Sequence, residues 1–271
     1  MTTGPLISVV VPTLNTQRTL ARCLTSIRAQ SYPHVELVVV DNRSTDATTA
    51  IARDHADVVA TCGPERSAQR NHGWRISSGE YVIFIDADMV LAGDIVAEVV
   101  DAFRAGPDLG ALVIPELAFG DGFLARCRAL EKRLYLGDSR VEAARAFPRQ
   151  VLDKVGGYDE DITGFEDWEL PDRVLAAGYR LGRVSSFIMH DEGRISLRRA
   201  FHKKRYYGRW LPRYRKAQQA VPRPLGRPAL LSHPGLVLRA PHRFAGLLLL
   251  KTTEWSGLAL GAHEGKWAAR L

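Results

Sequence analysis

Short apolar runs alternate with amphipathic segments over the first two thirds of the chain, and this alternation restricts the possible folds more than any other feature. The runs Ile7–Val11 and Val35–Val40 are almost continuously apolar and rich in valine, which is typical of strands buried on both faces of a parallel sheet. Between them, Thr19–Gln30 places apolar residues at helical spacing. These three segments therefore predict a βαβ unit.

The same alternation continues to about residue 190. We expect further strands at Val58–Thr61, Tyr81–Ile85, Ala111–Pro115 and Phe187–His190, and further helices at Ala47–Arg53, Ala68–Ser77, Asp94–Arg104, Phe123–Leu136, Gln150–Val155 and Glu166–Ala177. The predicted fold class is α/β, with a Rossmann-like, doubly wound and mostly parallel sheet. Ligands of such sheets bind beyond the carboxyl ends of the strands, which here directs attention to Pro12–Asn15, Asp41–Asp46 and Asp86–Asp88.

The sign of the charge changes near residue 193. Gly193–Leu250 holds 14 Lys or Arg and no Asp or Glu. The whole chain has 37 basic and 30 acidic residues, so a net charge of +7 conceals an acidic body with 23 basic and 30 acidic residues. We expect a domain over residues 1–192 and a basic, proline-punctuated helical extension over residues 193–271 that packs on the domain or on a membrane surface. Helices are expected at Ile195–Ala217 and Phe244–Gly261, on either side of the proline-containing stretch Val221–Pro241.

Nothing in the chain indicates export or a membrane span. The N-terminus lacks the basic and apolar regions of a signal peptide. Phe244–Ala262 is interrupted by Lys251 and Glu254, so it falls short of the roughly 18 to 20 apolar residues that cross a bilayer. The three cysteines are widely spaced and form no metal-binding pattern. We expect a reduced, cytoplasmic protein, with peripheral contact to the inner face of the membrane through the basic segment.

Two carboxylates follow the predicted strand Tyr81–Ile85. Asp86 and Asp88 can both reach one hard cation if the backbone turns there, and Mg²⁺ in proteins typically binds one or two carboxylates together with phosphate oxygens. An Asx turn that only ends the strand is the alternative. His190 ends another apolar run, and it becomes a further metal ligand if the two strands are neighbours.

Two more acidic motifs leave alternatives open. Asp41 is the first polar residue after Val40, where it can accept hydrogen bonds from a nucleoside, although the loop that follows can equally cap a helix. Glu166 and Asp167 stand at a predicted helix start, where the helix dipole favours acidic residues. Both capping and general-base catalysis therefore remain open for this pair.

Together and in this order, the motifs of residues 6 to 192 resemble those of family 2 glycosyltransferases with the GT-A fold. The matching motifs are Val9–Asn15, Val40–Asp46, Ala68–Gly73, Asp86–Asp88, Gly156–Glu160 and Glu166–Trp168. One departure is that Asn42 and Arg43 stand where many members have Asp and Gly.

The resemblance implies a role for each motif. A nucleotide-sugar donor, most often a UDP-sugar, would be bound by Pro12, Thr13, Asn15, Asp41, Arg70, Asn71 and Asp86. A divalent cation, Mg²⁺ or Mn²⁺, would be bound by Asp88 together with Asp86 and His190. Asp167, beside Glu166, would be the catalytic base, and the acceptor side would be lined by Gly157, Tyr158, Asp159 and Trp168.

The activity implied is metal-dependent, inverting transfer of a sugar to an acceptor hydroxyl, whose proton passes to Asp167. The acceptor, a lipid-linked or small molecule, has no signature in the chain. A nucleotidyltransferase that makes a nucleotide-sugar is a second enzyme candidate, although no Gly-rich phosphate loop follows the first predicted strand.

Cations and aromatic side chains interleave after His190. The stretch from Arg194 to Lys216 contains ten Lys or Arg and no acidic residue. It can form a solvated helix face, a membrane contact that includes the last helix, or a contact to phosphate. The residues expected at phosphate or membrane are Arg194, Lys203, Lys204 and Tyr207, with Leu247, Leu248, Trp255 and Leu258 of the last helix at the membrane. A nucleic-acid-binding protein is the alternative from another class, but it leaves the acidic motifs unexplained, so no nucleic-acid partner is expected.

Overall fold

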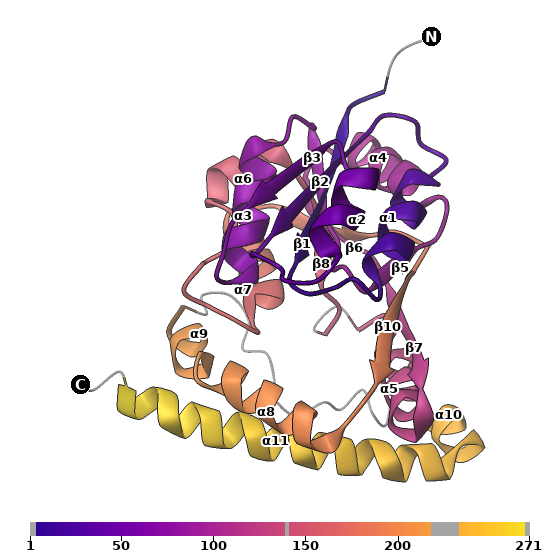
Figure 1. Cartoon of the computed structure of the whole chain (residues 1–271), viewed down its shortest axis with the longest axis vertical. Helices are drawn as coiled ribbons and strands as arrows, with labels where there is room; N and C mark the ends of the chain where they lie inside the picture. Colours follow the sequence, from indigo (N-terminus) through magenta and orange to yellow (C-terminus); the bar gives the residue numbers. More distant parts are fainter. Residues whose placement is uncertain (1–3, 139–140, 218–232, 269–271) are drawn as a thin grey trace.

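A seven-stranded sheet forms the centre of the computed structural model, which describes residues 4–138, 141–217 and 233–268 (Figure 1). Its strands run in the order β3-β2-β1-β4-β8-β6-β9. Their bounds are β1 Ile7–Thr13, β2 Val35–Asp41, β3 Val58–Thr61, β4 Tyr81–Phe84, β6 Leu109–Val113, β8 Ala144–Pro148 and β9 Arg180–Arg183. Most pairs are parallel, but β8 runs antiparallel to both β4 and β6. The predicted α/β class with a mostly parallel sheet is confirmed.

Helices cover both faces of this sheet because its central strands are apolar on both sides. In β1, Val9 and Val11 point into one core and Val10 points into the other. The first core is covered by α1 (Leu20–Arg28), α2 (Thr48–His55) and α4 (Ile95–Ala105), and the second by α3 (Arg66–Ile76), α6 (Arg149–Val155) and α7 (Glu166–Ala176). The three cysteines are free thiols, two of them buried.

A second sheet, of three strands in the order β5-β10-β7, leads from the body to the C-terminal helices (Figure 1). Its strands are β5 (Met89–Leu91), β7 (Glu116–Asp121) and β10 (Ile188–Arg194), and β7 continues into α5 (Gly122–Tyr135). Strand β10 runs through the expected boundary between residues 192 and 193, and the division into two parts stays a prediction.

The sequence did not reveal four strands and one helix break. Strands β5 and β9 have only 3 and 4 residues, and neither β7 nor β8 contains a β-branched residue, so pairing with neighbours rather than propensity makes them strands. The expected single helix Ile195–Ala217 is two helices, α8 (Leu197–Gly208) and α9 (Leu211–Ala217). Two more follow, α10 (Pro234–Arg239) and α11 (Pro241–Ala268). Residues 221–232 of the proline-containing stretch lie outside the described residues.

Helices α8 and α11 pack with their backbones in contact. Gly257, Gly261 and Gly265 recur every four residues of α11 and lie against carbonyl oxygens at α8. A Cβ atom on Gly261 would lie 1.9 Å from the carbonyl oxygen of Arg205, far inside van der Waals contact. Glycine alone permits this approach, as in closely packed membrane helices.

Four charged side chains attach α11 to α5. Lys251 lies 2.8 Å from Glu131 and 2.5 Å from Glu254, and Arg128 pairs with both glutamates. Lys251 and Glu254 are each 3% exposed, so the two charges that interrupt the apolar stretch of the sequence face inward. Burial favours the neutral form of Glu254, but Arg128 and Lys251 outweigh it and lower the pKa of Glu254 to about 2. Among the described helices, none is long and apolar enough to cross a membrane.

The contact between the two backbones predicts opposite effects for one substitution at two glycines. Alanine stabilises a helix by up to about 1 kcal/mol relative to glycine. Gly235→Ala in α10 should stabilise the chain in this way, because nothing lies within 4 Å of the added methyl group. At Gly261 the methyl group meets the Arg205 carbonyl, so Gly261→Ala should destabilise the chain by about 1–3 kcal/mol. Urea unfolding of both variants measures the difference, and equal stabilities would contradict the contact.

The ion pairs of Glu254 predict an acid-sensitive attachment of α11. The pKa of Glu254 falls from an ordinary 4.5 to about 2. The stabilisation of the folded state by its carboxylate is therefore complete above pH 4.5 and is lost as the pH falls towards 2. Over that range the free energy of unfolding should fall more steeply in the wild type than in Glu254→Gln. Asp153→Asn, which removes an exposed carboxylate of α6, should behave like the wild type. Parallel pH curves for Glu254→Gln and the wild type would refute this role.

Candidate active site

The carboxyl ends of neighbouring strands bring the first acidic motifs together. Strand β1 lies between β2 and β4, so Thr13, Asp41 and the residues after Phe84 share one edge of the sheet. The Thr13 hydroxyl donates to Asp41 over 2.9 Å, and the amide and hydroxyl of Ser44 donate to the same carboxylate. Asp41 is buried, and part of its hydrogen-bonding capacity therefore closes the loop after β2.

The loop after β1 is tied to the loop after β2. Asn15 has a left-handed backbone with φ 52°, and its side-chain oxygen accepts a hydrogen bond of 2.9 Å from the Thr45 amide. Pro12 precedes it and is buried, whereas Asn15 is exposed. The side chain of Gln69 on α3 donates to the carbonyl oxygen of Thr13 in β1 over 2.9 Å and to that of Val40 in β2 over 2.7 Å. The two loops therefore form one rigid edge beside α3.

Arg70 of α3 is the centre of a network of alternating charges. Its guanidinium is fully buried and lies 2.7 Å from Asp86 Oδ1 and 2.8 Å from Asp167 Oδ1. It also lies over the ring of Tyr158, 5.1 Å from the ring centre. Burial alone would lower the pKa of Arg70, but Asp167 and Asp86 outweigh it and raise this pKa well above its ordinary value. Arg70 thus holds a permanent positive charge between the acidic motif after β4 and the start of α7.

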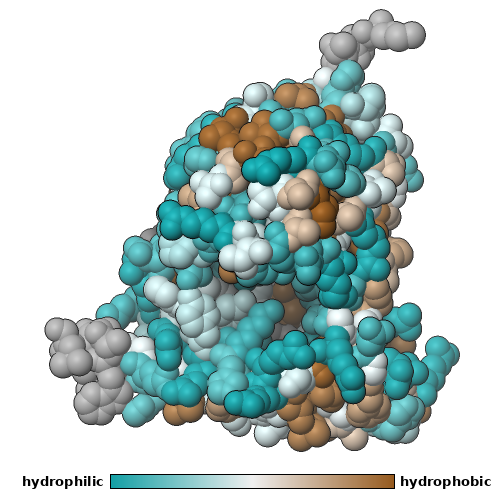
Figure 2. All heavy atoms as spheres, in the orientation of Figure 1, coloured by the Kyte–Doolittle hydropathy of each residue, from teal (hydrophilic) through white to brown (hydrophobic). Residues whose placement is uncertain are grey.

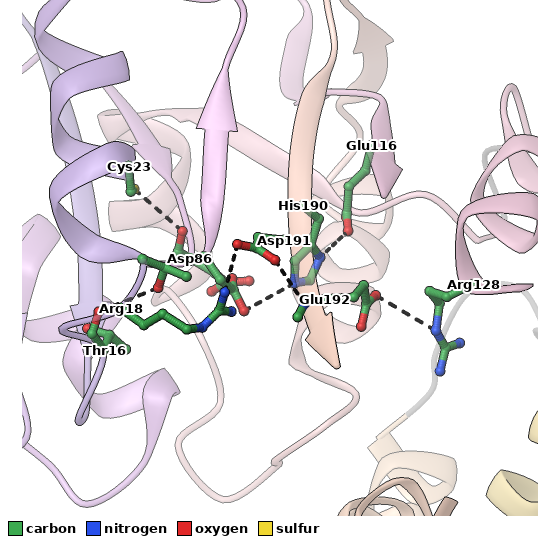
Figure 3. Close-up of polar contacts among 12 residues, drawn as sticks. Thr16, Arg18, Cys23, Asp86, Glu116, Arg128, His190, Asp191 and Glu192 are labelled. Atoms are coloured by element: carbon green, nitrogen blue, oxygen red, sulfur yellow. Dashed lines mark hydrogen bonds and ion pairs between the residues drawn. The ribbon is translucent and has the colours of Figure 1, made fainter. Parts of the chain in front are cut away.

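His190 of β10 lies between two carboxylates. Its Nε2 atom is 3.2 Å from Asp88, and its Nδ1 atom is 2.6 Å from Glu116, towards which the ring points in Figure 3. From the sequence, His190 becomes a metal ligand if its strand is a neighbour of the one that ends at Asp86. Instead β10 pairs with β5, the short strand directly after Asp88, and this pairing brings the two side chains together. Burial would lower the pKa of His190, but the hydrogen bonds to Asp88 and Glu116 raise it to about 10.

The network contains residues that sequence reasoning does not identify. Arg145 of β8 is buried 3.5 Å from Asp86 and 3.2 Å from Glu116, and Lys132 of α5 lies 2.7 Å from Glu116. Burial would raise the pKa of Asp86, but the arginines on either side hold it well below its usual range. The one sequence signal for Arg145 is that it is a single arginine within the otherwise apolar segment of β8. Because arginine is rarely buried without a partner, an arginine at such a position indicates a nearby carboxylate.

Glu166 and Asp167 begin α7 but face different surroundings. The side chain of Glu166 is 2% exposed and lies 3.0 Å from Arg66, which also donates to the Tyr207 hydroxyl over 3.3 Å. Burial raises the pKa of Glu166. The side chain of Asp167 is 31% exposed. The pair therefore divides into a buried, ion-paired glutamate and an accessible aspartate.

A cavity of about 440 Å³ lies between these residues and the C-terminal helices. Figure 2 shows the molecule hollowed between its upper body and its lower layer. The body contributes Asp86, Glu166, Asp167, Trp168 and His190 to the lining, and the opposite wall comes from α8 and α11. All four residues expected at phosphate or membrane, Arg194, Lys203, Lys204 and Tyr207, line this cavity. It therefore brings the acidic motifs and the start of the basic segment to one space.

The loop expected on the acceptor side is held behind Arg70 and is not part of the cavity lining. Asn71 donates to the carbonyl oxygen of Tyr158 and accepts from its amide, each over 2.9 Å. A Cβ atom on Gly157 would lie 2.5 Å from the Asn71 side-chain oxygen, so the loop depends on glycine there. Asp159 caps the next turn by accepting from the Asp161 amide over 2.8 Å. In this arrangement Asn71 supports the loop that contains Tyr158.

A divalent cation fits Asp88 better than Asp86. One carboxylate oxygen of Asp88 is buried and has no hydrogen-bond partner among the described residues, whereas both oxygens of Asp86 face arginines. Within residues 4–138, 141–217 and 233–268, no group of three or more acidic, histidine or cysteine side chains is arranged to hold a metal. His190 can join Asp88 as a ligand only after losing its proton. Most ligands of a cation at Asp88 must then come from substrate phosphate and water.

Comparison with known sequences assigns the family. A model of "Glycosyl transferase family 2" matches residues 8–155. The glycosyltransferase GlyA of Streptococcus pneumoniae is 38% identical over 88 residues, which cover 30% of this chain and 13% of that protein. The pre-mycofactocin glycosyltransferase of Mycobacterium tuberculosis is 27% identical over 222 residues, covering 74% of this chain and 46% of that protein. The chain spans less than half the length of either relative.

Solved structures share the fold over nearly the whole chain. The mannosyltransferase PcManGT of Pyrobaculum calidifontis, in complex with GDP-Man and Mn²⁺, matches 99% of this chain and 81% of its own, with a TM-score of 0.63 and 24% identity. TarS of S. aureus in complex with UDP-GlcNAc matches 97% of this chain and 92% of its own, with a TM-score of 0.54 and 15% identity. The family model covers more than half of the 271 residues and the fold agrees with it, so the chain belongs to glycosyl transferase family 2.

Proposed function

We propose that this chain catalyses metal-dependent, inverting transfer of a sugar from a nucleoside diphosphate sugar to an acceptor hydroxyl bound in the cavity. The observation that carries the proposal is that one buried guanidinium, that of Arg70, holds both Asp86 and Asp167 at the border of that cavity. Membership of the family supports the reaction class. The position of Asp167 supports the assignment of the base.

The donor nucleoside is proposed to lie over the carboxyl ends of β1 and β2, beside Thr13, Asn15 and Asp41. This edge is rigid and adjoins Arg70 through Gln69, so a diphosphate extending from it reaches the end of β4. A UDP-sugar remains the expected donor. GDP-Man is the second candidate, because PcManGT holds it whereas TarS holds UDP-GlcNAc.

Asp167 is proposed to act as the general base. Arg70 binds Oδ1 of its carboxylate, which fixes the orientation of the side chain and leaves Oδ2 to accept the proton of the acceptor hydroxyl as that oxygen attacks the anomeric carbon. Glu166 is buried against Arg66, so we assign it to positioning the first turn of α7 and not to proton transfer. Trp168, on the cavity wall, is proposed to contact the acceptor.

Asp88 is proposed to hold the divalent cation, Mg²⁺ or Mn²⁺, with His190 as a further ligand once deprotonated. A cation there would neutralise the charge that develops on the departing diphosphate. Arg194, Lys203, Lys204 and Tyr207 face the same cavity and are proposed to contact phosphate groups of the donor or the acceptor.

Asp167→Asn tests the base directly. Asparagine keeps the size of the side chain but cannot accept the proton, so turnover should fall by about 100- to 10,000-fold. Donor affinity should change little, because Asp167 is proposed to act on the acceptor. Release of nucleoside diphosphate measures turnover and calorimetry measures donor binding, with Asp153→Asn as the control. Turnover near that of the wild type would remove Asp167 from this role.

Asp88→Ala tests the metal site without relying on activity. In the wild type, a nucleotide-sugar should raise the melting temperature more with Mn²⁺ than with a chelator, because a ligand that binds only the folded state stabilises it. Asp88→Ala should lose the Mn²⁺-dependent part of that shift, and Asp101→Asn, on α4 and exposed, should retain it. Both UDP-sugars and GDP-sugars should be tested as the nucleotide-sugar in these melting experiments. An Mn²⁺-dependent shift of full size in Asp88→Ala would contradict the site.

The products separate the two enzyme candidates. A glycosyltransferase releases free nucleoside diphosphate from a nucleotide-sugar, whereas a nucleotidyltransferase forms a nucleotide-sugar from a sugar phosphate. Net synthesis of a nucleotide-sugar would therefore favour the second candidate.

A further inference from the structure

We propose that the solvent-facing side of α11 is a docking surface for an anionic phospholipid bilayer. The outer face of α11 consists of the exposed residues along the middle of the helix, Ala245, Leu248, Leu249, Thr252, Trp255, Ser256, Ala259 and Leu260. None of them is charged. Leu248, Leu249, Trp255 and Leu260 are between 42% and 54% exposed. The inference does not depend on the proposed transferase activity.

The middle of α11 differs from an ordinary surface helix in where it places its charged residues. A helix of a water-soluble domain turns its charged side towards solvent and its apolar side towards the core. In α11 the charged residues Lys251 and Glu254 are buried against α5, and the apolar outer face points away from the body. Four large apolar side chains on one exposed helix face, spaced over about three and a half turns, form a patch that a monomer in water does not need.

The patch continues beyond the outer face at the start of α11. Leu238 of α10 is 78% exposed, and Phe123 of α5 is 43% exposed. Phe123 stacks on His242, with ring centroids 6.3 Å apart, so it lies beside the first turn of α11. Figure 2 shows apolar side chains at the lower edge of the molecule, where α11 lies in Figure 1. With 28 residues, α11 is about 42 Å long, and a helix lying in the interface buries its apolar face about 5–10 Å deep.

The charge around the patch favours lipid over another occupant. No acidic residue occurs between Gly193 and Leu250, and exposed cations stand on α8, at the end of α10 and at the start of α11. Those that do not line the cavity are Arg198, Arg239 and Arg243. Anionic headgroups attract such cations. In a two-fold contact between copies of this chain, by contrast, these cations would need acidic partners on the same face, and the outer face of α11 has none.

The actual outer face corrects the residues expected at a membrane from the sequence. Leu248 and Trp255 belong to it. Leu247 is fully buried against α5, and Leu258 is half-buried beside α9, so neither can reach a bilayer. The burial of Lys251 and Glu254, not the hydropathy of the whole segment, is what exposes an uncharged face.

The docking surface lies directly behind the cavity. Lys251 and Glu254 line the cavity from the inner side of α11, and α8 contributes Lys203 and Lys204 to the same wall. With the outer face on a bilayer, the cavity lies only about one helix diameter, roughly 10 Å, from that face. An acceptor anchored in the membrane by a lipid therefore needs to rise only a short distance to enter it.

Vesicle co-sedimentation of the full chain tests the proposal. The probes are vesicles of phosphatidylcholine alone and of phosphatidylcholine with about one third phosphatidylglycerol. We expect binding to the anionic vesicles that weakens with added salt, since salt screens the cations. The double variant Leu249→Glu with Leu260→Glu should partition at least about tenfold less. Ile76→Glu makes the same change at a side chain of α3 that is 40% exposed, and it should bind like the wild type.

Two further measurements keep the result interpretable. Trp255→Phe should still bind but should lose much of the blue shift in tryptophan fluorescence on binding. The double variant should keep the wild-type melting temperature, because the outer face contributes little to the core. Absence of binding by the wild type, or equal binding by the double variant, would overturn the proposal. A dimer in light scattering that the double variant dissociates, without vesicle binding, would assign the face to a second copy.

Discussion

The buried guanidinium of Arg70 is the interaction on which the site depends. A charge removed from water is tolerated only when partners of opposite charge replace the lost hydration, and Arg70 finds them in Asp86, 16 residues away, and Asp167, 97 residues away. Satisfying this one charge holds the end of β4 and the start of α7 against α3. The alternation of positive and negative side chains continues towards the second sheet through Arg145, Glu116, His190 and Asp88.

The C-terminal helices extend this arrangement to the far side of the cavity. Helix α11 turns Lys251 and Glu254 inward to meet Arg128 and Glu131 of α5, and its glycines let α8 lie against its backbone. A helix held in this way presents Leu248, Leu249 and Leu260 outward. The inner wall of the cavity and the apolar outer face are therefore two consequences of one packing arrangement.

Sequence reasoning identified the acidic motifs because each stands at the end of a strand or the start of a helix whose apolar pattern is local. It did not identify Arg145 or Glu116, since β7 and β8 become strands only through their neighbours. The spacing of the two carboxylates, without the family resemblance, also does not distinguish Asp86 from Asp88. Both follow β4 two positions apart, yet Asp86 faces two arginines while Asp88 faces His190 and keeps one oxygen without a described partner. The roles of Asn71 and Tyr158 were equally hidden, because their contact joins segments 87 residues apart.

The sequence by itself determined the doubly wound α/β fold, the family and the places where acidic residues gather, because apolar periodicity and short motifs act over a few neighbouring residues. Only the tertiary structure decided the antiparallel insertion of β8, the pairing of β10 with β5, and the different surroundings of Glu166 and Asp167. It also decided which way α11 faces. Lys251 can be buried only because Glu131, 120 residues away, meets it, and no local pattern of hydropathy contains that information.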